Sequence, residues 1–161
     1  MTKHLMICAI AAVSFAPTVL QAQHMTPFKG HWSGETISAD LSTFPLVSVL
    51  SEGEGRATHL GRYFMASPHT SDVFTGETIG EQIFTAANGD MLTAHCEGFP
   101  LPQPDGTVEG SLDCLFTSGT GRFADASGSY EFYLVATPKP GIFPPIYETQ
   151  ARITGLISSG Q

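Results

Sequence analysis

Apolar and polar residues alternate along most of the chain after residue 22, and turn residues such as Gly, Pro, Asn and Asp interrupt the alternation at short intervals. A period of two residues is typical of strands with one buried face, and no long helical period is present. We therefore predict eight strands, at 28–37, 45–51, 56–66, 72–86, 90–97, 107–117, 128–137 and 146–158. The Pro-rich stretches 99–104 and 138–145 are expected to be loops, because proline cannot donate a ladder hydrogen bond.

The turn between the fourth and fifth predicted strands suggests a pairing register. Asn88-Gly89 is the preferred residue pair of a two-residue type I′ hairpin. Centring the hairpin on this pair places Thr85 opposite Leu92. Ile83 then shares the apolar face with both residues, since side chains alternate along a strand.

The two cysteines after residue 22 give a second, independent cue. Centring the next hairpin on Asp105 places Cys96 directly opposite Cys114. Directly opposed cysteines on antiparallel strands can form a disulfide. The alternative is a pair of buried free thiols.

The same alternation sorts the remaining strand residues into two faces. Side chains expected to point inward are Phe28, Trp32, Tyr130, Phe132, Leu134, Tyr147, Ala151, Ile153 and Ile157. Those expected to point outward are His31, Glu35, Gln82, Thr93, His95, Glu97, Asp113, Glu131, Glu148 and Arg152. Closing such strands into a barrel buries the apolar face and removes exposed edges. The expected fold class is therefore all-β, a single eight-stranded antiparallel barrel.

Length and charge limit the classes of partner. The chain has 161 residues, which suits one domain, and it carries 7 Lys and Arg against 15 Asp and Glu, a net charge of -8. Nucleic-acid binding and polybasic attachment to a membrane both need clustered cations, so neither is expected.

Residues 1–22 have the features of a secretory signal peptide. Lys3 precedes the apolar run 5–15, which is shorter than the roughly 20 residues of a membrane span, and small Ala22 follows Gln21. Cleavage would leave a barrel domain at 23–161 without a stable membrane anchor, secreted or periplasmic. An uncleaved anchor or a buried N-terminal helix is the alternative. Export to an oxidising compartment would favour the Cys96–Cys114 disulfide.

The most specific motif is GTGRFADASG at 119–128. It resembles a turn of the allene oxide cyclase and dirigent superfamily, and the segments 55–64, 84–92 and 151–158 resemble exported bacterial members of an allene-oxide-cyclase-like group. The resemblance implies a calycin-like eight-stranded barrel over about 28–158, with homo-oligomers in related families. The motif also has a structural interpretation of its own: its glycines permit positive φ, and Phe123 can plug one end of the core.

Candidate chemistry is sparse. The histidines form no H-x-H or H-E-x-x-H pair, and no G-x-S-x-G motif is present, so neither a metal site, a cofactor nor a hydrolase triad is expected. The alternation places three polar side chains among apolar ones: Arg62, Glu77 and Tyr130. Together with Trp32 and Phe132 they are the candidate ligand-binding residues. A bulge would instead turn the polar side chains outward, and Gly76 and Gly80 make one plausible near Glu77.

A carboxylate, a guanidinium and a phenol in an apolar lumen suit a small apolar or amphipathic ligand, and an inward Arg62 favours an anionic one such as a fatty or aromatic acid. The leading hypothesis is thus an exported binding barrel. One alternative is a cofactor-free cyclase or isomerase that holds a reactive substrate in the lumen; the catalytic residues would then be unknown. Another is a structural or envelope-interaction protein with a filled core.

Overall fold

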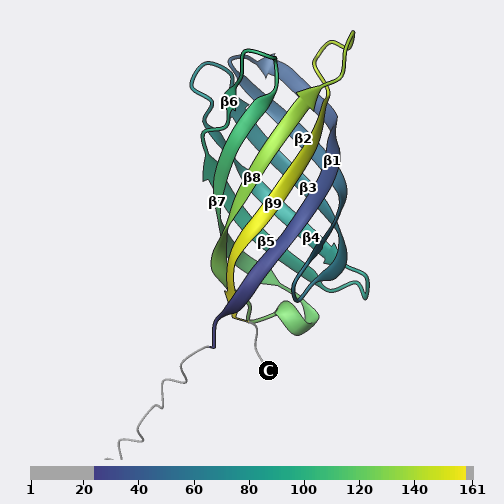
Figure 1. Cartoon of the computed structure of the whole chain (residues 1–161), viewed down its shortest axis with the longest axis vertical. Helices are drawn as coiled ribbons and strands as arrows, with labels where there is room; N and C mark the ends of the chain where they lie inside the picture. The colour runs from purple at the N-terminus through teal and green to yellow at the C-terminus, as the bar shows by residue number, and fades with distance from the viewer. Residues whose placement is uncertain (1–23, 159–161) are drawn as a thin grey trace, which may run out of the picture.

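The computed structural model describes residues 24–158, and it is a barrel of antiparallel strands (Figure 1). Eight long strands form the wall: β1 Thr26–Thr43, β2 Leu46–Ala57, β3 Gly61–Asp72, β4 Thr78–Ala86, β5 Met91–Gly98, β7 Val108–Gly119, β8 Ser127–Pro138 and β9 Tyr147–Ser158. The short β6, Leu101–Pro102, pairs only with the start of β7. The single turn of 3-10 helix η1, Gly121–Phe123, precedes β8.

Each long strand pairs with the next along the chain, and β1 pairs with β9 to close the barrel. The pairing of β5 with β7 closes the remaining gap, because β6 lies outside this circuit. The predicted all-β, eight-stranded antiparallel barrel is therefore confirmed. Between residues 24 and 158 no helix is long and apolar enough to cross a membrane. The predicted signal peptide, residues 1–22, lies outside the described residues.

The strand boundaries differ from the prediction in the first half of the chain. Strand β1 extends to Thr43, and the predicted strand 56–66 is divided by a turn at 58–60 that joins β2 to β3. The predicted strand 72–86 begins at the last residue of β3 and includes the loop at 73–77, and β4 starts only at Thr78. The turn at 58–60 decides which side chains of β3 point inward.

The β4–β5 hairpin has a different register from the predicted one. The amide of Ala86 donates to the carbonyl of Asp90 (2.9 Å), and the amide of Gly89 donates to the carbonyl of Ala86 (2.9 Å). Gly89 has φ of 87°, whereas Asn88 is not among the described residues with positive φ, so the two-residue type I′ turn does not form. A three-residue loop forms instead, and Thr85 pairs with Met91.

This one-residue shift reverses the faces of β4, because the side-chain period of a strand is two. Gln82 and Phe84 are buried, while Ile83 and Thr85 lie on the opposite, partly exposed face. The predicted inward placement of Ile83 and Thr85 and the predicted outward placement of Gln82 were therefore wrong.

The register of β5 and β7 is as predicted. Cys96 lies opposite Cys114, the two Cα atoms are 4.1 Å apart, and the sulfur atoms form a disulfide. Both cysteines are buried in the barrel wall. The face assignments for β1, β8 and β9 also agree with the structure. Leu134, Tyr147 and Ala151 are half-buried, and the other residues predicted to point inward on these strands are fully buried.

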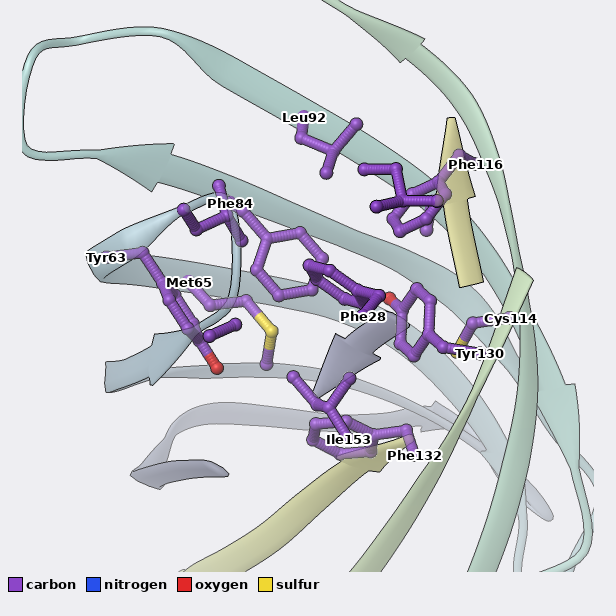
Figure 2. Packing of buried hydrophobic residues seen from close by; sticks show 14 of the residues in the cluster. Phe28, Tyr63, Met65, Phe84, Leu92, Cys114, Phe116, Tyr130, Phe132 and Ile153 are labelled. Carbon is purple, nitrogen blue, oxygen red and sulfur yellow. The ribbon is translucent and has the colours of Figure 1, made fainter. Parts of the chain in front are cut away.

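Aromatic side chains fill the half of the barrel that is closed by η1. Figure 2 shows Phe28 between Phe84 and Tyr130, and its ring centroid lies 6.3 Å and 5.4 Å from theirs. Phe116 packs edge-on to Phe28 at 5.2 Å. Phe123 of η1 is buried in the same cluster, as the motif predicted. This half is a solid core.

Candidate functional site

The other half of the barrel contains a cavity of about 350 Å³. It opens at the end where β6 and the β8–β9 loop lie, opposite η1 (Figure 1). Small side chains point inward here, where the closed half has aromatic rings. Those that are also buried include Thr36, Ser51, Ser67, Ala136 and Thr149. The lumen stays open here because these side chains are too small to fill it.

Two aromatic side chains and a methionine separate the cavity from the solid core. Trp32 and Phe132 lie with ring centres 6.0 Å apart, and Met65 lines the cavity beside them. The indole of Trp32 lies over Gly34, where an added Cβ would come within 2.2 Å of the ring. The absence of a side chain at Gly34 therefore leaves the space that the indole of Trp32 occupies.

Gln82 is the most deeply buried polar side chain of the cavity wall, with 1% of its surface exposed. The hydroxyl of Tyr130 donates to Gln82 Oε1 over 2.8 Å. Burial raises the pKa of Tyr130 well above its usual value, with a smaller contribution from nearby Tyr63, so the phenol is neutral and keeps the proton that it donates.

His69 is the one histidine among the cavity-lining residues that the structure describes. Its Nδ1 lies 3.0 Å from the carbonyl oxygen of Ser67. Burial lowers the pKa of His69, and the contact with Ser67 opposes this effect only in part. The ring is therefore neutral at pH 7.

Of the five predicted ligand-binding residues, Trp32 and Phe132 line the cavity, and Tyr130 lies in the solid core and reaches the cavity wall through Gln82. Arg62 does not point inward. Its side chain is 70% exposed, and Nη2 lies 3.7 Å from Glu54 Oε2. The prediction counted alternation from Leu60, but Leu60 belongs to the turn before β3, and the inward residues of β3 begin at Tyr63.

Glu77 is also on the outside. It lies exposed in the loop before β4, and its backbone carbonyl accepts a hydrogen bond from the amide of Asp72 (2.8 Å). Sequence reasoning missed His69 and Gln82. The alternation that places Phe84 inward also places Gln82 inward. A prediction with a three-residue loop at 87–89 would therefore have assigned Gln82 to the inner face.

Exposed aromatic side chains gather around the open end. Four loop residues at this end are exposed phenylalanines, and these are Phe44, Phe74, Phe99 and Phe143. Phe44 and Phe74 contact each other edge to face, with ring centroids 5.5 Å apart. We call these four residues the aromatic rim; of the four, Phe44 lines the cavity.

Charge is sparse within the cavity. Among the described residues that line it, none is Lys or Arg, and the ionisable side chains are His69, Asp72 and Tyr147. Asp72 Oδ1 accepts hydrogen bonds from the amides of Phe74 and Thr75 at the mouth. No group of three or more His, Cys, Asp or Glu within residues 24–158 is arranged to hold a metal ion.

No protein-family model and no curated protein sequence matches the chain. Among solved structures, the barrel is similar to that of a pterocarpan synthase dirigent protein, with a TM-score of 0.50 and 14% sequence identity. The match covers 94% of this chain and 100% of the other. A likeness at this identity concerns the fold. The chain therefore forms a dirigent-like barrel with a solid half and a hollow half.

Proposed function

We propose that the protein binds a small apolar or amphipathic molecule in the hollow half of its barrel. The observation that carries this proposal is the cavity of about 350 Å³, whose wall is mostly apolar with a few buried polar groups. Small-molecule sites in proteins have this composition and volumes of about 300–1,000 Å³. The aromatic rim supports the proposal because it offers apolar surface at the mouth.

Binding can be followed through Trp32, since the chain contains 1 Trp and this residue lines the cavity. Native mass spectrometry of protein purified from its own host should show a retained ligand, and titration with that ligand should change the tryptophan emission. Ala136→Phe should abolish the change, because Ala136 lines the cavity and a phenyl group there fills the space. Thr137→Phe is the matched control on the outer face of the same strand. Equal binding by both variants would contradict the proposal.

A cofactor-free cyclase or isomerase of the same fold stays an alternative, because it would use the same cavity. It requires turnover of a substrate that is lost in Ala136→Phe and kept in Thr137→Phe. The open lumen argues against the filled-core alternative, because a cavity lowers the stability of a core through lost packing contacts.

We also propose that the protein is exported, with residues 1–22 removed. The buried Cys96–Cys114 disulfide supports this, because disulfides persist in oxidising compartments. N-terminal sequencing of exported protein should begin near Gln23, whereas a cytoplasmic protein that retains Met1 would contradict it. Homo-oligomers stay a prediction from the resemblance.

A further inference from the structure

Two side chains that line the cavity each carry a buried hydrogen-bond donor without an acceptor in the described part of the chain. They are Trp32 Nε1 and Gln82 Nε2, and their side chains are 2% and 1% exposed. The amide oxygen of Gln82 is already used by the hydroxyl of Tyr130. The amide is thereby oriented, and its nitrogen is the arm that remains without a partner.

Such donors are unfavourable in isolation, since a buried polar group without a partner has lost its hydrogen bonds to water and gained none in return. Both side chains line the one cavity that we propose to hold the ligand. A ligand acceptor that reached either donor would remove this cost. Buried polar groups of this kind give binding sites their selectivity, because a ligand that cannot pair with them leaves them unsatisfied.

We propose that the ligand is an uncharged molecule with a hydrogen-bond acceptor, of the carbonyl or ether class, that pairs with Trp32 Nε1 or Gln82 Nε2 at the base of the cavity. This inference rests on the proposed binding function and specifies its ligand. It replaces the anionic ligand expected from Arg62.

The charge of the cavity supports an uncharged ligand. Within residues 24–158, no Lys or Arg side chain lines the cavity, while the carboxylate of Asp72 lines it. A carboxylate ligand would therefore lose its hydration without gaining a cation, which weakens its binding or forces its protonation. A ketone carries the same acceptor geometry at no charge.

Three naphthalene probes of matched shape test the inference by calorimetry. Methyl naphthyl ketone carries the acceptor, isopropenylnaphthalene replaces the oxygen with a CH₂ group, and naphthoate adds the charge. We expect the ketone to bind about tenfold more tightly than the alkene, as one hydrogen bond to a buried donor allows. Naphthoate should bind more weakly than the ketone.

Variants assign the preference to the two donors. Trp32→Phe and Gln82→Met each remove one donor, and the ratio of ketone to alkene affinity should fall toward one in at least one of them. Leu134→Met is the control, because Leu134 lines the cavity without a polar atom and should keep the ratio. The ratio cancels general changes in cavity shape. If a variant fails to fold, infrared spectra of the wild-type complex decide, since a hydrogen-bonded ketone shows a lower carbonyl stretching frequency than the ketone in hexane.

The outcomes separate the two proposals. Equal binding of ketone and alkene, tightest binding of naphthoate, or a ratio unchanged in both variants would overturn the acceptor inference while leaving the binding cavity in place. If no probe binds, and no ligand is retained from the host, both proposals fail.

Discussion

At the scale of single residues, the shape of the cavity depends on where the chain has no side chain. Gly34 points toward the lumen beside the indole of Trp32, and a Cβ at this position would come within 2.4 Å of the carbonyl oxygen of Glu52 on β2 as well as touching the indole. Backbone of the neighbouring strand cannot move aside without disturbing the ladder. Gly34 therefore fixes both the closeness of β1 to β2 and the position of the cavity base.

Gly34→Ala should accordingly destabilise the barrel by about 1–3 kcal/mol, the usual cost of an overpacked core. The midpoint of urea denaturation should fall, and the emission of Trp32 should shift because the indole is displaced. Ser33→Ala, on the exposed outer face of the same strand, should leave both unchanged. A Gly34→Ala variant as stable as the wild type would show that β1 and β2 can separate locally.

A second residue-scale prediction concerns His69 and pH. The pKa of His69 is lowered in the folded protein, so the unfolded chain binds a proton first as the pH falls below about 6.5. The free energy of unfolding should therefore decrease as the pH falls from about 6.5 toward the folded pKa of His69. The His69→Gln variant keeps the other histidines. In urea denaturation, its free energy of unfolding should decrease less between pH 7.5 and 5.5 than that of the wild type. Identical pH profiles would contradict a neutral, half-buried His69.

At the scale of elements, the hairpins decide how far the sequence can predict the site. Alternation within a strand assigned β1, β8 and β9 correctly, and with them Trp32 and Phe132. The assignment of inward and outward side chains cannot be carried from one strand to the next, however, when the length of the turn between them is unknown. Arg62 was misplaced because a turn ends at Leu60, and Gln82 because the loop after Ala86 has three residues. The cysteines had no such error, because disulfide pairing fixes a register independently of turn type.

The three-residue loop itself predicts an effect of substitution. Gly89 has φ of 87°, and a Cβ there would meet no atom within 4 Å, so any cost of Gly89→Ala comes from the backbone alone. A non-glycine residue in this region loses about 1–2 kcal/mol. Gly89→Ala should lower the urea midpoint accordingly, and Gly89→Asn should lower it less, because asparagine tolerates positive φ better. Equal losses in both variants would argue that the loop adopts another conformation.

At the scale of the whole molecule, the barrel combines a rigid half with a half that can receive a ligand. The aromatic cluster around Phe28 joins strands from opposite sides of the barrel, because its rings come from β1, β4, β7 and β8. The disulfide lies where β5 meets β7, the contact that bridges the short β6 excursion. Pro100, Pro102 and Val108, in the segment that the disulfide closes, line the cavity, whereas the two cysteines belong to the solid core.

Removing the disulfide should therefore destabilise the whole barrel. The cysteines are 18 residues apart, and cross-linking a loop of about this length stabilises a protein by about 3 kcal/mol, mainly by restricting the unfolded chain. We expect a reductant to lower the urea midpoint of the wild type in a single transition observed through Trp32. The Cys96→Ala/Cys114→Ala variant should unfold at a similarly low midpoint and should not respond to reductant. A wild-type midpoint that is the same with and without reductant, once thiol labelling has confirmed that both cysteines are reduced, would show that the aromatic core alone sets the stability of the barrel.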